Sequence, residues 1–319
     1  MSESQNSDLV LLDSQDGIAY LTINRPKALN ALNEGVVSQL EEKFNAAEAD
    51  AGIRAIVIRG AGDKAFVAGA DIKYFIENIK TNRVQDTVAF TTRGHELFRR
   101  IETCRKITVA VLDGLSLGGG SELALSCQAI VATPAGSMGF PETAIGIFPG
   151  LGGMLRSAHQ IGSRLAKYYV FTGRNLSAQD AYDLGIITRL VEPADLDKAI
   201  REVCAAPAPN KYRKREIPSR FQEMADVCSP DNVKLLLAGE KPTGVADEFA
   251  EKTLKTVAKK APVALKVANE LIDAQEKAGG IDEGMAIEIA RLGEIFHTED
   301  ALIGLSSVGG KEAPKYQGK

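Results

Sequence analysis

Residues 117–125 read Leu-Gly-Gly-Gly-Ser-Glu-Leu-Ala-Leu, and they are the part of the sequence that is most informative about the fold. The three glycines, Gly118–Gly120, follow the apolar run Ile107–Leu112 and open a predicted helix. Because glycine has no side chain, another group can approach the backbone there closely. A helix N-terminus also offers N–H groups without partners and a partial positive charge. The stretch therefore predicts a strand-to-helix junction of an α/β protein that can bind an oxygen atom.

Two other uses of Gly118–Gly120 stay open from the residues alone. The glycines could allow a helix and a strand to pack tightly, or their N–H groups could bind a phosphate. The run matches neither GxGxxG nor GxxxxGK[ST], so the common nucleotide-binding motifs are absent.

Short apolar runs alternate with helical patterns around this junction. Asp16-Gly17 separates two apolar segments and predicts a hairpin, and Asn33 is a candidate N-cap for the helix after it. Continuous apolar runs without polar alternation are typical of strands that are buried on both faces. They occur at Ala55–Ile58, Ile107–Leu112 and Ala129–Ala132. This alternation predicts an α/β fold with a largely parallel sheet.

The C-terminal part of the chain has a different pattern. Apolar residues recur at helical spacing over 246–258, and Pro262 suits the first position of another helix. A proline-containing stretch of mixed charge at about 205–244 predicts an insertion with one or two short helices. We therefore expect a core at 1–195 and a helical region at 196–319 that includes this insertion.

Composition excludes several classes of protein. The chain has 319 residues, a net charge of −4, 45% hydrophobic and 25% charged residues, which is typical of a globular protein. This charge gives no general attraction to nucleic acid or to anionic lipid. The sequence has no apolar run of about 18 residues, so it predicts no membrane span. The N-terminus, MSESQNSDLV, shows no targeting signal, so we expect a cytoplasmic protein.

The cysteines and histidines do not form a predicted metal site. Their spacing lacks the short repeats of metal ligands, so we expect reduced thiols in the cysteines and surface or helix-face positions for the histidines. These residues are Cys104, Cys127, Cys204, Cys228, His95, His159 and His297.

A second junction without bulky side chains resembles the first one physically. Residues 65–72 read Ala-Phe-Val-Ala-Gly-Ala-Asp-Ile and follow the run Ala55–Ile58. Two backbone N–H groups, one from each junction, could hold one oxygen from two sides. Such an oxyanion hole typically lowers a barrier by about 3–4 kcal/mol for each donor.

Two glutamates accompany these junctions. Glu122 falls in the first turn of the helix that the glycines open, where a surface carboxylate is also common. Glu142 follows Pro141 among apolar residues, where loss of water would raise its pKa and suit it to proton transfer near neutral pH. The pair is a candidate acid/base site for a water molecule or an α-proton.

In this order the motifs resemble the crotonase (enoyl-CoA hydratase/isomerase) superfamily. The resemblance rests on AFVAGADI at 65–72, GGGSELAL at 118–125 and PETAIGIFPGLGG at 141–153. NRPKALNAL at 24–32 resembles the opening motif of the superfamily, and the segment from Phe296 to Pro314 resembles its closing helix. The likeness covers about 10–200 and about 246–316.

The resemblance implies a fold, a site and a substrate class. The fold would be a spiral of ββα turns with a C-terminal helical region, assembled as a homotrimer or a dimer of trimers. The backbone N–H groups of Ala70 and Gly119 would form the oxyanion hole, and Glu122 and Glu142 would be the catalytic residues. The substrate would be an acyl-CoA, with no metal and no further cofactor. The CoA-binding residues would be Lys27, Ala28, Leu29, Ala68, Asp71, Ile72 and Lys311.

The chain departs from the family pattern in two respects, and one of them, Ile107 where the family often has proline, has no chemical consequence. The insertion at about 205–244 resembles that of 3-hydroxyisobutyryl-CoA hydrolases. Those hydrolases usually lack the glutamate at Glu122 and have an acidic residue where Gly150 stands here. Because the reaction depends on groups beside the substrate, the site residues favour a hydratase.

We therefore predict an enoyl-CoA hydratase, which adds water reversibly to a 2-enoyl-CoA to give a 3-hydroxyacyl-CoA through an enolate. The alternatives are thioester hydrolysis, double-bond isomerisation or C–C cleavage at the same oxyanion hole. A binding or RNA-associating homologue is favoured only by the basic cluster Lys211–Arg215, for which a solvated surface is the simpler interpretation. The depth of the acyl pocket would depend on Tyr74, Phe75, Phe90 and Leu97.

Overall fold

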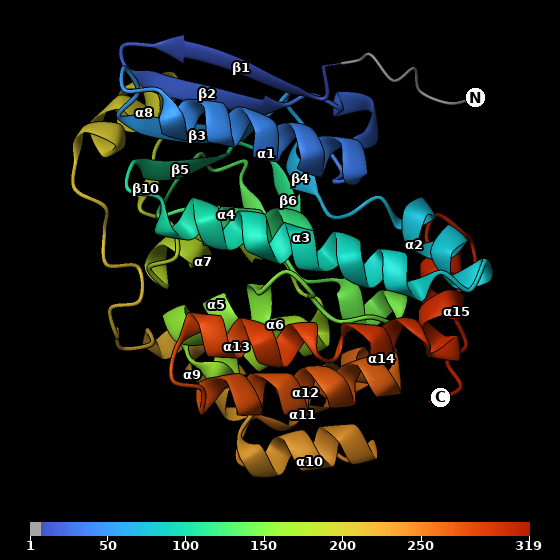
Figure 1. Ribbon diagram of the computed structural model, residues 1–319. Helices are drawn as coiled ribbons and strands as arrows, with labels where there is room; N and C mark the ends of the chain where they lie inside the picture. The colour runs from blue at the N-terminus through green and yellow to red at the C-terminus, as the bar shows by residue number, and fades with distance from the viewer. Residues whose placement is uncertain (1–7) are drawn as a thin grey trace.

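The computed structural model describes residues 8–319 (Figure 1). The expectation that MSESQNSDLV carries no targeting signal falls mainly on residues outside this range. Across the described residues, no helix has both the length and the apolar character needed to cross a membrane.

The larger of two sheets has six strands in the order β1-β2-β3-β5-β7-β10. β1 (Val10–Gln15) and β2 (Ile18–Ile23) are antiparallel, and Asp16 (φ 52°) and Gly17 (φ 74°) form the predicted hairpin turn between them. The pairs from β2 to β10 are parallel, as predicted. These strands are β3 (Ala55–Gly60), β5 (Ile107–Leu112), β7 (Ala129–Ala132) and β10 (Arg189–Leu190).

A second sheet of four very short strands completes the spiral. Its order is β4-β6-β8-β9, and its strands are β4 (Ala65–Ala68), β6 (Leu115–Leu117), β8 (Ser137–Gly139) and β9 (Leu176–Ser177). Consecutive strands β3–β4, β5–β6 and β7–β8 each contribute one strand to each sheet, which is the expected ββα turn. The sequence suggested that the glycine run follows β5 directly. In the structure, β6 lies between β5 and the glycine run.

Helices cover both faces of the larger sheet, which explains the continuous apolar runs. All six residues of β5 are buried, and α8 (Leu196–Ala205) packs against β5 and β7 on one face. α1 (Glu34–Ala49) buries its apolar side in the main core on the other face. Its N-cap is Asn33, as predicted, whose side chain accepts a hydrogen bond from Val36 N at 2.9 Å.

The remaining helices build the site and the C-terminal region. They are α2 (Ile72–Lys80), α3 (Val84–Thr103), α4 (Gly119–Ser126), α5 (Gly153–Ile161), α6 (Ser163–Thr172), α7 (Ala178–Asp183), α9 (Gln222–Asp226), α10 (Pro230–Ala238), α11 (Asp247–Val257), α12 (Pro262–Glu276), α13 (Ile281–Ile289), α14 (Leu292–Phe296) and α15 (Glu299–Ser307). Four 3-10 helices join them: η1 (Pro26–Ala28), η2 (Glu142–Ile145), η3 (Pro193–Asp195) and η4 (Ser219–Phe221). The predicted insertion holds two short α-helices, α9 and α10, and Pro262 is the first residue of α12 as expected. Figure 1 shows α12 to α14 along the side of the molecule opposite β1.

The basic cluster at 211–215 is not simply a solvated surface. The Lys211 ammonium lies 2.7 Å from Glu102 and also donates to two carbonyls at the C-terminal end of α4. The Tyr212 hydroxyl also donates to Glu102, which binds the buried Arg156 at 3.0 Å. Burial alone would raise the pKa of Glu102, but Arg156 and Lys211 lower it to about 2.

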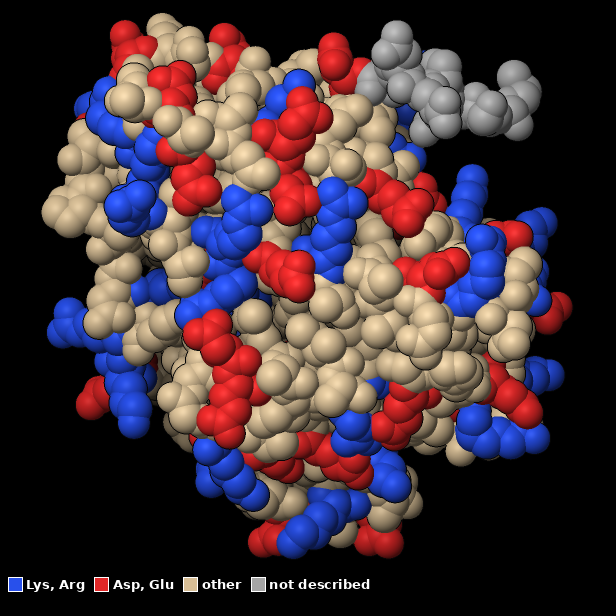
Figure 2. Space-filling model, viewed as in Figure 1, with Lys and Arg blue, Asp and Glu red and all other residues tan. Residues whose placement is uncertain are grey.

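The exposed-surface interpretation therefore holds for residues 213–215 and is wrong for Lys211 and Tyr212. These two side chains fasten the insertion to the core beneath α4. Figure 2 shows acidic and basic side chains interspersed over the visible face, with no broad patch of one sign. Both observations count against the nucleic-acid alternative.

Candidate active site

An apolar cavity of about 290 Å³ brings the two predicted junctions together. Its wall includes Ala70, Gly119, Glu122 and Glu142, so the four predicted groups of the site line one cavity. Most of the remaining wall is apolar, and its largest contributions come from α3, from the segment 141–151 and from the C-terminal region. A cavity of this kind suits a small apolar group that is held by a few polar contacts.

The two predicted N–H donors lie beside each other. Ala70 follows β4, and its neighbours Gly69 and Asp71 bond the backbone of Leu32. Gly119 is the first residue of α4. A Cβ atom placed on Gly119 would lie 3.9 Å from Ala70 N. Neither Ala70 N–H nor Gly119 N–H has a hydrogen-bond partner within residues 8–319, so both can donate to one ligand oxygen.

The glycines also pack tightly, so the packing interpretation and the binding interpretation are compatible. A Cβ on Gly120 would lie 1.9 Å from Val67 O, a contact that brings α4 against β4. Gly118 has a φ of +48°, and a Cβ there would lie 2.2 Å from Glu142 Oε1. Larger residues at these two positions would move the N-terminus of α4 or the carboxyl of Glu142.

Glu122 is buried and is held by the loop that precedes α5. Its Oε1 accepts hydrogen bonds from Leu151 N at 2.7 Å and Gly153 N at 2.9 Å. Burial, and next the charge of Glu288, raise the pKa of Glu122 to about 8, although the two N–H groups oppose this rise. These bonds orient the carboxyl and stabilise its ionised form.

Glu142 lies at the start of η2 and is also buried, as its apolar neighbours predicted. Its Oε2 has no hydrogen-bond partner among the described residues. Burial, followed by the charge of Glu122, raises the pKa of Glu142 well above its ordinary value. Two such carboxyls in one apolar cavity favour a state in which one is ionised and the other is protonated.

A third buried carboxylate, which the sequence analysis missed, holds the same loop from the other side. Glu288 in α13 accepts a hydrogen bond from Gly152 N at 2.7 Å and another from Gln275 Nε2 at 2.9 Å. His95 Nε2 lies 3.1 Å from Glu288 Oε1, and both side chains are fully buried. Of the two positions expected for the histidines, His95 therefore has a helix-face position, on the buried side of α3, and not a surface one.

Glu288 and Glu122 together hold the loop before α5 through hydrogen bonds. The N–H groups of Leu151, Gly152 and Gly153 go to Glu122, Glu288 and Glu122 in turn. A charged residue between two isoleucines of α13 was the signal in the sequence that pointed to a buried, partnered glutamate.

The family model described as Enoyl-CoA hydratase/isomerase matches residues 18–319. The chain belongs to the enoyl-CoA hydratase/isomerase family. A short-chain-enoyl-CoA hydratase of Clostridium acetobutylicum is 36% identical over 218 residues, which are 67% of this chain and 82% of the relative. A mitochondrial 3-hydroxyisobutyryl-CoA hydrolase of Xenopus laevis is 32% identical over 275 residues, which are 81% of this chain and 70% of the relative.

Solved structures show the same fold. The crystal structure of an enoyl-CoA hydratase from Rhodobacter sphaeroides has a TM-score of 0.83 and 22% identity, with 98% of this chain and 93% of that chain covered. The family and its crotonase-type fold are thus confirmed. The enoyl-CoA hydratases among the relatives agree with the predicted activity.

Three of the predicted CoA-binding residues line the cavity or bond a residue that lines it, namely Leu29, Ala68 and Ile72. Ala68 and Ile72 line the cavity, and Ala68 N donates to Leu29 O at 3.0 Å. Lys27 and Ala28 belong to η1, directly before Leu29, and the Lys27 side chain is exposed. The opening motif of the chain therefore lies next to the site.

The other two predicted CoA-binding residues are placed differently. Asp71 caps α2 through Lys73 N and forms an ion pair with Arg25 at 3.2 Å, so its carboxylate already has partners inside the protein. Lys311 is exposed and lies three residues after Val308, which lines the cavity. Lys311 is thus close to a cavity residue in the sequence. Within residues 8–319, the structure shows no hydrogen bond or ion pair between Lys311 and the residues that line the cavity.

Within residues 8–319, no three His, Cys, Asp or Glu side chains are grouped as metal ligands would be. The four cysteines are all buried and unpaired. Burial raises the pKa of Cys127 to about 12, which makes its thiol inert near neutral pH.

Proposed function

We propose that the protein hydrates a 2-enoyl-CoA reversibly to a 3-hydroxyacyl-CoA. The observation that carries this proposal is that the N–H groups of Ala70 and Gly119, which have no hydrogen-bond partner within residues 8–319, lie in one cavity with Glu122 and Glu142. The N–H groups would bind the thioester oxygen and stabilise the negative charge that develops on it. The carboxyls would carry out the two proton transfers that addition of water requires.

The hydrogen bonds of the two carboxyls support separate roles for them. Glu122 has two N–H donors that favour its ionised form, so it would orient water and take its proton while the oxygen attacks Cβ. Glu142 has an oxygen without a donor, so it would be the protonated carboxyl and give its proton to Cα as the enolate collapses. The C=C bond becomes a single bond, and the atoms of one water are added.

The cavity also bears on the hydrolase alternative. Gly150 stands where the related hydrolases usually have an acidic residue, and a Cβ at this position would lie 3.0 Å from Leu292 Cδ2. A side chain there would require the end of the Leu292 side chain to shift by a few tenths of an ångström. The retained Glu122 and the absence of an acidic side chain at residue 150 both favour hydration over hydrolysis.

Other features of the proposal rest on the family resemblance. The CoA part of the substrate would bind along Lys27, Ala28, Leu29, Ala68, Asp71, Ile72 and Lys311. We propose a spiral core at 1–195 and a C-terminal region at 196–319 that completes the cavity through Leu292, Phe296 and Val308. A homotrimer or a dimer of trimers, a cytoplasmic location and the absence of any cofactor beyond CoA remain parts of this proposal.

The proposed reaction is tested with crotonyl-CoA and purified protein, without added metal or nucleotide. We expect the intact thioester to gain the mass of one water, because the site provides a base, an acid and an oxyanion hole. Mass spectrometry of the thioester and a thiol assay for released CoA are run on the same sample. Rapid release of CoA as the main product would contradict hydration and favour the hydrolase.

A further inference from the structure

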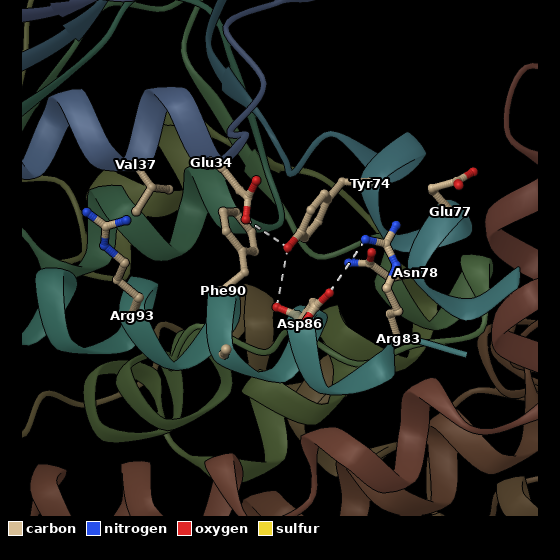
Figure 3. A pocket seen from close by; sticks show the side chains of 10 residues that line it. Glu34, Val37, Tyr74, Glu77, Asn78, Arg83, Asp86, Phe90 and Arg93 are labelled. Atoms are coloured by element: carbon tan, nitrogen blue, oxygen red, sulfur yellow. Dashed lines mark hydrogen bonds and ion pairs between the residues drawn. The ribbon is translucent and has the colours of Figure 1, made fainter. Parts of the chain in front are cut away.

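A surface cleft of about 370 Å³ shares part of its wall with the active-site cavity. Figure 3 shows its charged rim, to which Glu34, Asp86, Arg83 and Arg93 contribute. Three carboxylates and two guanidinium groups line this cleft in all, so it is polar, whereas the active-site cavity is mostly apolar. The two spaces belong to different environments but are close neighbours.

Two side chains line both spaces and form the wall between them. They are Val37 from α1 and Phe90 from α3. Figure 3 shows the Phe90 ring between Val37 and Tyr74. Phe90 is the larger of the two, so removal of its ring would open the wider passage between the cavity and the cleft.

The substrate must extend toward this wall if the proposed function is correct. With the thioester oxygen at Ala70 and Gly119, the carbons beyond Cβ can only occupy the apolar remainder of the cavity. Three aromatic rings in contact with one another line this part: Phe75 lies 6.1 Å from Phe90 and 5.2 Å from Phe296, centroid to centroid. Because protein interiors are closely packed, a longer chain must displace one of these rings.

Polar contacts hold the wall in place from the cleft side. The Tyr74 hydroxyl donates to Glu34 Oε1 at 2.9 Å and also lies 3.4 Å from Asp86 O, an alternative acceptor, so it links α2 to α1 and α3. The Tyr74 ring lies 5.3 Å from the Phe90 ring. Displacement of Phe90 toward the cleft would therefore disturb these bonds.

From this arrangement we infer that Phe90 is a specificity-determining residue that closes the acyl pocket and restricts the enzyme to short 2-enoyl chains. The inference rests on the proposed function and deepens it. The cavity volume of about 290 Å³ agrees, because it lies just below the roughly 300–1,000 Å³ that is usual for small-molecule pockets. Of the residues expected to set pocket depth, Phe75 and Phe90 line the cavity, Tyr74 lines the cleft, and Leu97 lines neither.

The experiment compares Phe90→Ala and Phe90→Leu with the wild type on crotonyl-CoA, 2-hexenoyl-CoA and 2-decenoyl-CoA. We expect the wild type to prefer crotonyl-CoA by at least about tenfold in kcat/KM. Phe90→Ala should raise the ratio of decenoyl to crotonyl activity by at least about tenfold, and Phe90→Leu by less. Leu97→Ala is the matched control, because Leu97 is a buried residue of the same helix. It should leave this ratio unchanged.

Calorimetric binding of butyryl-CoA and decanoyl-CoA keeps the test independent of the reaction. The wild type should bind butyryl-CoA more tightly than decanoyl-CoA. The affinity for decanoyl-CoA should increase in both variants, and most in Phe90→Ala. A wild type that accepts decenoyl-CoA as well as crotonyl-CoA, or a ratio that Phe90→Ala and Phe90→Leu both leave unchanged, would overturn the inference. A wild type that hydrates none of the thioesters but binds butyryl-CoA in preference would overturn the proposed function and support the wall.

Discussion

Glu142→Gln is expected to lower kcat for hydration of crotonyl-CoA by at least about a hundredfold, the usual scale for a lost general acid. The amide has nearly the same size, but it has no acidic proton to give to Cα. Glu142 is buried against Gly118, so a change in shape would disturb the oxyanion hole, whereas this isosteric change should not. Steady-state kinetics with crotonyl-CoA measures the effect.

The control for this variant is Glu96→Gln. Glu96 is an exposed carboxylate on α3, so its replacement should leave kcat within about twofold of the wild type. Binding of a saturated acyl-CoA should be nearly unchanged in both variants. Close to full activity in Glu142→Gln would show that Glu142 is structural and that the two-carboxyl mechanism is wrong.

Glu122→Gln is expected to cause a loss of at least about a hundredfold in kcat as well, for a different reason. The amide oxygen of Gln can still accept the hydrogen bonds from Leu151 N and Gly153 N, so the loop before α5 should stay in place. The variant lacks a group that can take a proton from water. Thermal unfolding checks that stability is retained while kcat is measured.

The pH profile separates this role from a structural one. Glu122 has a raised pKa and must be ionised to act as the base, and it becomes protonated as the pH falls. The wild-type rate should therefore decrease as the pH is lowered, and Glu122 should govern this acidic limb of the pH–rate profile. Glu122→Gln should lose that limb. If the residual rate of the variant keeps the wild-type acidic limb, another group is the base.

The long elements of the fold were predictable because their patterns are long. The runs at Ile107–Leu112 and Ala129–Ala132 are strands with those bounds, and Asn33 caps α1. The four strands of the smaller sheet were missed as separate elements because each has two to four residues, too few for a pattern of period two. Only the family resemblance implied a second strand in each turn.

For the site, too, local motifs could be predicted from the sequence, whereas contacts between residues far apart in the chain could not. Ala70, Gly119, Glu122 and Glu142 lie in motifs that can be recognised in the sequence, and the structure brings all four to one cavity. The contact between Gly152 N and Glu288 joins residues 136 positions apart, so no local pattern could reveal it. Lys211 likewise appears as part of a basic run, and only the fold shows Glu102 beneath it.

We propose that two backbone N–H groups, at Ala70 and Gly119, polarise the carbonyl of a bound thioester. Truncating side chains cannot remove these donors, and Gly119→Pro would also disturb the turn. The direct measurement is the infrared or Raman stretch of the thioester C=O in a non-reacting acyl-CoA analogue at saturation. We predict a shift to lower frequency on binding, because both N–H groups draw charge onto the oxygen. An unshifted carbonyl, with the ligand confirmed in the cavity, would contradict the oxyanion hole and every reaction that depends on it.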